Sequence, residues 1–390
     1  MTNPDISSPI RSIDFDLPLV RTAPTRRGEK RNTIRAGLRL YIDCETGLFR
    51  SAISKNTDLL ISQDYEVGSL LGVPMGDRGI GEEYLFEYVE HVAALRPQRL
   101  LEIASGIGQA AIKLSLRGIA VVGIDPNLKP PTNPETNKLL TLVNGFFPQH
   151  VPRDLPKFDL VCSHAFLEHA DDPVSMLRVM SEWCNPDGFV LAAVPDCSDS
   201  IEQGDCSMLL HEHRSYFTPL SLFHSAFLAG LTSINISKSK FGGVLYLVAK
   251  ASGENIVGDV TLTDYQWPES STNDWNWERQ ILRFALNRNK VVKKIESFDR
   301  GGGLRLIYVP HRIINFIDGI LESIPVDDAD CFQDTLVEGF RHRVRSLDRI
   351  SDRPDMVLLA SHSFEIRLRE SIQNRWDGVP IVTLRELLSQ

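Results

Sequence analysis

The chain has 390 residues, 42% of them hydrophobic and 24% charged, which is ordinary for folded globular domains and excludes a disordered or collagen-like chain. Its 42 lysines and arginines are outnumbered by 51 aspartates and glutamates, and the resulting formal charge of -9 argues against nucleic acid as a main partner. Because no stretch approaches the roughly 18 apolar residues of a membrane span and no apolar signal region follows the first methionine, we expect a cytoplasmic protein without membrane contact.

The cysteines indicate reduced thiols rather than a disulfide framework or a zinc ribbon. None of the six forms a Cys-x-x-Cys pair, and three lie in or beside apolar segments that resemble core. We therefore predict no metal site. The length fits two or three domains, which we place at residues 1–75, 76–251 and 252–390.

The first segment, residues 1–75, gives few local signals. A basic cluster, Arg26–Arg31, reads as a solvated loop, with a phosphate contact as the alternative, and residues 38–42 read as a short strand.

Residues 76–251 alternate between strand and helix patterns. An amphipathic helix over 82–95 precedes strands at 99–104 and 120–125, which flank a glycine turn and a helix. Further strands are predicted at 141–145, 158–164 and 188–195, and helices at 173–184 and 218–230. Residues 234–241 and 243–250 then predict an antiparallel pair. This order indicates an α/β domain with a mostly parallel sheet closed by an antiparallel strand.

Residues 252–390 predict a connection followed by a long helix over 275–297 and a second, smaller α/β domain. Its pattern gives a strand over 303–309, a helix through 313–324, strands near 324–327 and 355–361, a further helix and a last strand from 380.

The turn after the first strand of the middle domain predicts a nucleoside site. Gly106 and Gly108 open a helix whose first N–H groups have no partner, and they let a ligand approach the backbone. Asp125 ends the next strand 19 residues after Gly106, where a carboxylate can accept both hydroxyls of a ribose. The motif alone also satisfies the dinucleotide fingerprint, so a nicotinamide oxidoreductase stays as an alternative. Glu102 opposes it, because a carboxylate suits an ammonium group better than a pyrophosphate.

Glu102, the glycine turn and Asp125 together resemble the class I S-adenosylmethionine methyltransferases, with Ala104 in place of the first glycine of their motif. The resemblance covers about residues 85–250 and implies a Rossmann-like core that binds S-adenosylmethionine and releases S-adenosylhomocysteine. It implies Glu102, Ala104, Gly106, Gly108 and Asp125 as cofactor residues. Asn144, after the third strand, either contacts the adenine or merely ends its strand.

A polar segment after the fifth strand carries the candidate bases. Two histidines, a glutamate and a tyrosine lie within residues 211–216, and a glutamate that orients a histidine is an arrangement for general base catalysis. A solvated loop, or a zinc site of His211, His213 and a cysteine, is the alternative. The segment is similar to one in the nucleotide-sugar C-methyltransferases, which methylate deoxysugars beside a 4-keto group. That resemblance implies His213 as the base, with Glu212 as its partner and His169 as a second histidine.

The same family has an N-terminal zinc segment and a C-terminal α/β domain, and both ends of this chain resemble them. Only Cys44 remains of the zinc ligands, and Leu210 stands where the family has a tyrosine. We therefore expect methyl transfer to a sugar or nucleotide-linked sugar, carbon being slightly preferred over a hydroxyl or amine. A non-catalytic partner protein with the same fold is the remaining alternative. Oligomeric state has no sequence signal.

Overall fold

The computed structural model describes residues 12–19, 34–63, 80–128, 138–251, 261–262, 277–362 and 364–389. The basic cluster Arg26–Arg31 and the predicted boundaries at 75/76 and 251/252 lie outside, or at the edge of, the described residues. Within them, no helix is long and apolar enough to cross a bilayer.

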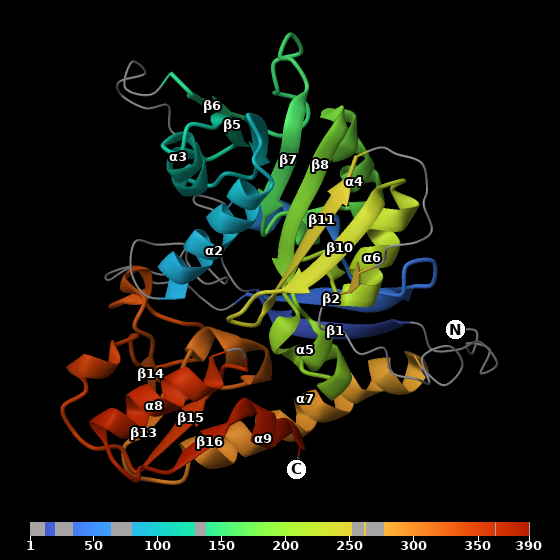
Figure 1. Cartoon of the computed structure of the whole chain (residues 1–390). Helices are drawn as coiled ribbons and strands as arrows, with labels where there is room; N and C mark the ends of the chain where they lie inside the picture. Colours follow the sequence, from blue (N-terminus) through green and yellow to red (C-terminus); the bar gives the residue numbers. More distant parts are fainter. Residues whose placement is uncertain are drawn as a thin grey trace, which may run out of the picture.

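An eight-stranded sheet forms the centre of the molecule (Figure 1). Its strands run in the order β12-β10-β11-β8-β7-β4-β5-β6, and β11 is antiparallel to both of its neighbours while the pairs from β8 to β6 are parallel. The mostly parallel sheet with an antiparallel closing strand is thus confirmed. The strands are β4 (Arg99–Ile103), β5 (Ala120–Asp125), β6 (Leu140–Asn144), β7 (Phe158–His164), β8 (Cys184–Pro195), β10 (Thr232–Lys238), β11 (Val244–Lys250) and β12 (Thr261–Leu262).

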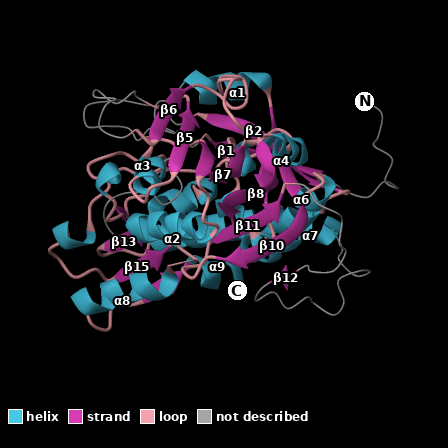
Figure 2. Ribbon diagram, turned by 45° about the horizontal axis from the view of Figure 1, so that its top comes forward, coloured by secondary structure: helices cyan, strands magenta, loops and turns pink. Residues whose placement is uncertain are grey.

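Helices cover both faces of this sheet (Figure 2). On one face α2 (Ile80–Ala94) and α3 (Gln109–Ser115) share a core with Leu100, and on the other α4 (Pro173–Glu182) and α6 (Pro219–Leu228) share one with Leu101 and Ile103. This alternation along β4 is the two-residue period of a strand buried on both sides. It directs Glu102 to the α2 face.

The N-terminal part forms a second, antiparallel sheet in the order β1-β2-β3-β9. Its strands are β1 (Ser12–Pro18), β2 (Arg35–Asp43), β3 (Leu48–Ile53) and β9 (Ser215–Tyr216), and α1 (Lys55–Gln63) follows β3. The sequence predicts only one strand in this part, at residues 38–42; that strand is part of β2, and β1 and β3 were missed. In β1, Phe15 and Leu17 are buried while Asp14 and Asp16 face outward, an alternation too short to stand out in the sequence.

The C-terminal part is a third sheet, wholly parallel, in the order β14-β13-β15-β16. The helix predicted through 313–324 is wrong: only a 3-10 turn, η4 (Pro310–Phe316), follows β13, and four consecutive residues of it, 313–316, are buried. The tight turn packs between α7 and the segment after β8. The elements are α7 (Trp277–Asp299), β13 (Arg305–Tyr308), β14 (Ile324–Val326), β15 (Met356–Leu359), α8 (Glu365–Arg375), β16 (Ile381–Thr383) and α9 (Leu384–Ser389).

One hydrophobic core joins the N-terminal sheet, α7, the C-terminal sheet and the segment after β8. In Figure 1 the blue strands β1 and β2 lie between the central sheet and the orange helix α7, and the red C-terminal sheet lies beside that helix. The segment after β8 contains α5 (Ser198–Gln203), η3 (Cys206–Met208) and β9, and therefore runs through the place where the three parts meet.

Candidate active site

The glycine turn after β4 has the backbone that a close ligand approach requires. Gly106 and Gly108 have φ of 56° and 84°, and a Cβ built on Gly106 would meet nothing within 4 Å. Ala104 also lies in the left-handed region, with φ of 55°. This explains why the methyltransferase motif has glycine at this position, since a side chain is strained there.

Glu102 is a buried carboxyl group that can accept further hydrogen bonds. It is 3% exposed, and its Oε2 has no hydrogen-bond partner. Burial raises the pKa of Glu102 to about 7. A buried carboxylate oxygen without a hydrogen-bond partner is costly unless a cation meets it, so this position fits an ammonium group.

Asp125 closes the turn from the neighbouring strand. Its Oδ2 accepts from the Gly106 N–H at 3.0 Å and its Oδ1 from the Asn127 N–H at 2.7 Å. Burial raises its pKa, and these backbone donors partly offset the rise. Each carboxylate oxygen has a second lone pair, so Asp125 can still accept ribose hydroxyls. Asn144 donates its Nδ2 hydrogens to Pro126 and Leu128 carbonyls, both at 2.8 Å, which gives it a role in shaping this loop.

On the other side of the site, the segment 205–216 is bonded to the N-terminal sheet. His211 donates from Nε2 to the Ala36 carbonyl at 3.0 Å. Ser51 donates through its N–H to the Arg214 carbonyl at 3.1 Å and through its hydroxyl to the His213 carbonyl. These bonds fix the backbone on both sides of Glu212.

The central and C-terminal domains bind the same segment. The Arg214 N–H donates to the Glu168 carbonyl at 2.7 Å. From η4, Asn315 Nδ2 donates to the Cys206 and Leu209 carbonyls at 2.8 and 2.6 Å.

A second C-terminal contact is the ion pair of His362 and Asp205, which are 2.8 Å apart. Asp205 is fully buried, and burial alone would raise its pKa. The hydrogen bond and charge of His362, together with hydrogen bonds from the Ser207 hydroxyl and N–H, more than offset this, so the pKa of Asp205 is lowered.

Four ionisable side chains then meet in one cluster: Glu168, His169, Glu212 and His213. Glu168 and His169 belong to the 3-10 turn η2 (Leu167–His169), which follows β7. The rings of His169 and His213 are 4.8 Å apart and nearly perpendicular. Sequence reasoning had selected three of the four. Glu168 was missed although it precedes His169 directly.

The cluster is acidic, and three of its carboxylate oxygens are shielded from water although His169, Glu212 and His213 are partly exposed as residues. Glu168 is 1% exposed, its Oε2 has no partner, and both carboxylate oxygens of Glu212 are buried without one. Burial raises the pKa of Glu168 to about 7, and His169 opposes the rise. Burial, then the neighbouring His169 and Arg312, lower the pKa of His213 well below its usual value. His213 is therefore neutral at pH 7 and has a lone pair for a proton.

The tautomer of His169 follows from its hydrogen bond. Its Nδ1 lies 3.0 Å from the Glu212 carbonyl, which can only accept, so Nδ1 carries the hydrogen and Nε2 has the lone pair.

Tyr216 and His164 lie apart from this chemistry. Tyr216 is fully buried and donates to the Leu210 carbonyl at 3.3 Å, so its hydroxyl is used within the fold. His164, at the end of β7, packs against Tyr88, and burial lowers its pKa to about 4.

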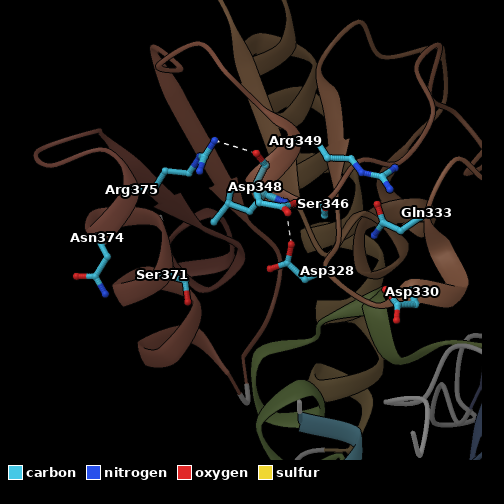
Figure 3. A pocket seen from close by; sticks show the side chains of 10 residues that line it. Asp328, Asp330, Gln333, Ser346, Asp348, Arg349, Ser371, Asn374 and Arg375 are labelled. Carbon is cyan, nitrogen blue, oxygen red and sulfur yellow. Dashed lines mark hydrogen bonds between the residues drawn. The ribbon is translucent and has the colours of Figure 1, made fainter. Parts of the chain in front are cut away.

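The C-terminal domain has a hollow of about 630 Å³ of its own (Figure 3). Arg375 donates there to the Asp348 and Ile350 carbonyls, and Asp328 accepts from the Leu347 N–H at 2.7 Å. None of the four cluster residues lines it, and its groups bind one another.

The central domain is similar to known methyltransferase domains. A family model described as "Methyltransferase domain" matches residues 79–235. The ubiquinone biosynthesis O-methyltransferase of Aliivibrio fischeri (strain MJ11) is 29% identical over 107 residues, which are 26% of this chain and 46% of that protein. The enzyme of the same name from Pseudomonas syringae pv. tomato is 29% identical over 108 residues, 26% and 47% of the two chains. The match thus spans less than half the length of these relatives.

Solved structures overlap with about half of the chain. Human N-acetylserotonin methyltransferase in complex with SAM has a TM-score of 0.37 and 16% identity, over 51% of this chain and 57% of that one. The Burkholderia thailandensis 1,6-didemethyltoxoflavin-N1-methyltransferase, with S-adenosylhomocysteine bound, has 0.39 and 15%, over 55% and 98%. Similarity at this level carries no conclusion about substrate.

Proposed function

We propose that this chain, whose residues 79–235 match a methyltransferase domain, transfers a methyl group from S-adenosylmethionine to a sugar or nucleotide-linked sugar. One observation carries the proposal: the unpartnered buried carboxyl of Glu102 lies beside a glycine turn that Asp125 closes. The pyrophosphate of a nicotinamide cofactor is negatively charged and would be repelled by that carboxylate, which argues against such a cofactor.

The residues at the ends of β4 and β5 fit the cofactor. Glu102 would bind its ammonium group, Asp125 its ribose, and the backbone of Ala104, Gly106 and Gly108 would let it approach closely. When bound, S-adenosylmethionine supplies an electrophilic methyl group on a sulfonium. Asn144 supports this pocket through its bonds to the 126–128 backbone, and an adenine contact remains part of the proposal.

The four-residue cluster would serve the acceptor. It follows β7 and is closed by the segment after β8, and in a parallel sheet these strand ends share one edge with the end of β4. The neutral His213 would take the proton from the acceptor, with the His169 ring packed against it. An orienting role for Glu212 would require its carboxylate, which has no hydrogen-bond partner here, to turn toward His213. For a carbon acceptor, the enolate formed beside a ketone attacks the methyl carbon as the carbon–sulfur bond breaks, and S-adenosylhomocysteine leaves. In-line displacement needs positioning more than further chemistry.

A hydroxyl or amine acceptor is the second candidate. Leu210 has no hydroxyl to stabilise an enolate, and the buried Tyr216 does not replace it, which favours an acceptor without an enolate. The matched relatives are named as O-methyltransferases, which points the same way. His213 would be the base in both reactions. The 252–390 domain would contribute to the substrate cleft, and the 1–75 segment would be a degenerate form of the family's zinc-binding domain.

The test is methyl transfer with matched acceptors. A nucleotide-linked 4-keto-deoxysugar and its 4-hydroxy counterpart are each incubated with the full chain and S-adenosylmethionine, and the products are followed by mass spectrometry. Carbon transfer predicts a methylated product from the ketone alone, with exchange of its α-proton into deuterated water. His213→Ala should abolish both, whereas His224→Ala, outside the cluster, should not.

Methylation of the 4-hydroxy sugar without α-proton exchange would contradict a carbon acceptor and establish the second candidate. Failure to bind S-adenosylmethionine would overturn the proposal and favour a non-catalytic partner.

A further inference from the structure

The cluster after β7 contains more buried acid than a base requires. Glu168 and Glu212 together have three buried carboxylate oxygens without any hydrogen-bond partner. A base needs one orienting carboxylate, not two. Glu168 is 1% exposed, and a buried carboxylate oxygen with no hydrogen-bond partner is costly unless a cation meets it, so the arrangement suits a positive charge at this point.

The geometry of the cluster is that of a ligand set. One atom each of Glu168, His169 and His213 lies within 4.8 Å of the other two, and among the described residues this is the group that can hold a metal ion. Because the Nδ1 hydrogen of His169 is donated to the Glu212 carbonyl, the Nε2 lone pair is left free. Such an outer bond to a backbone carbonyl is the usual device that orients a metal-binding histidine.

The elements that carry these ligands are fixed. Glu168 and His169 are in η2, and the Arg214 N–H bonds the Glu168 carbonyl, so η2 and the segment 205–216 cannot separate without breaking a backbone bond. A preformed set of two imidazoles and one carboxylate suits Zn²⁺, Co²⁺ or Fe²⁺ better than Mg²⁺, which prefers oxygen ligands.

We propose that Glu168, His169 and His213 form a site for a transition-metal ion, which inhibits methyl transfer by occupying the base. Metal binding stands on the cluster alone, whereas the inhibition rests on the proposed function, in which the His213 lone pair accepts the proton. Metal and proton would compete for one pair of electrons.

Co²⁺ is the probe, because its visible d–d absorption reports nitrogen and oxygen ligands directly. The purified full chain, freed of metal with EDTA and then of EDTA, is titrated with Co²⁺, and bound metal is counted by equilibrium dialysis. We expect one Co²⁺ per chain. Glu168→Gln and His169→Asn, which keep shape and can keep the bond to Glu212, should each lose at least tenfold in affinity. His224→Asn is the matched control and should bind as the parent chain does, since His224 lies on α6 outside the cluster.

Thermal unfolding and S-adenosylmethionine titration show whether Glu168→Gln or His169→Asn has lost its fold. If one has, the Co²⁺ affinity of the other variant decides whether the metal site exists. Substoichiometric Co²⁺, or unchanged affinity in both variants, would overturn the site. Inhibition is measured with Zn²⁺ and its reversal with EDTA. Full activity with the site saturated would overturn the regulatory part, whereas Co²⁺ binding in a chain that methylates no acceptor would leave the metal site standing and remove the proposed function.

Discussion

Glu102 provides the sharpest test of the cofactor site, because its charge decides how well an ammonium group binds. Burial raises the pKa of Glu102 to about 7, so half of the free protein has a neutral carboxyl there at pH 7. Only the ionised form attracts an ammonium. Cofactor binding should therefore weaken as the pH falls through 7.

The size of the effect follows from the two titrating groups. With a pKa of about 7, Glu102 is about 9% ionised at pH 6 and about 76% at pH 7.5. An α-ammonium loses its proton near pH 8, which reduces binding from the alkaline side. Together these give an affinity optimum near pH 7.5 and a loss of roughly sixfold at pH 6.

Isothermal titration with S-adenosylmethionine at half-unit steps from pH 6 to 9 measures this profile. Glu102→Gln should bind about tenfold more weakly at pH 7.5, since a hydrogen bond to a charged group is replaced, and should lose the acid limb while keeping the alkaline one. Glu82→Gln, on the exposed surface of α2, is the matched control and should leave the profile unchanged. Equal affinity of the parent chain at pH 6 and 7.5, or an acid limb retained by Glu102→Gln, would refute the reasoning.

Three further predictions concern single contacts. Asp125→Ala should weaken S-adenosylmethionine binding roughly 10–100-fold by titration, because it removes a charged acceptor and frees the Gly106 N–H; unchanged affinity would remove Asp125 from the ribose site. Ala104→Gly should raise the free energy of unfolding by about 0.5–1 kcal/mol in urea, since it relieves a left-handed alanine at some cost in chain entropy; a loss of stability would show that its methyl group packs usefully. Asn315→Ala should cost about 1–3 kcal/mol in the same assay, because the Leu209 carbonyl loses the Asn315 donor and the Cys206 carbonyl keeps only the Leu209 N–H. The loss should exceed that of Asn287→Ala, whose amide makes a single bond to the Gln203 carbonyl, and equal losses would contradict this.

The central sheet was predictable because its strands are buried on both faces and alternate with helices. Residues 120–125 form a strand as expected, and Glu102 and Asp125 lie at the strand ends where their spacing placed them. The glycine turn also has the positive φ values that its composition implies. Each of these features is local in sequence, which is why pattern and spacing suffice.

The acceptor side depends on contacts between distant parts of the chain. β9 is only two residues long and pairs Tyr216 with Phe49, a pairing for which neither segment has a local signal. Glu168 becomes a site residue only because the segment 205–216 buries its carboxyl. Sequence selected Glu212 and His213 from their type and resemblance, but the enclosure of the Glu212 carboxylate oxygens and the neutral state of His213 come from tertiary packing.

This dependence explains why a methyltransferase core would be joined to two further domains. The pair Glu212–His213 is in a segment with little secondary structure, and a base must be positioned closely to act. The N-terminal sheet bonds this segment through Ala36 and Ser51, and the C-terminal domain through Asn315. The N-terminal sheet bonds residues on both sides of the pair, and the C-terminal domain adds bonds further upstream, at Cys206 and Leu209. The strand pairing of β3 with β9 also connects the N-terminal sheet directly to this segment.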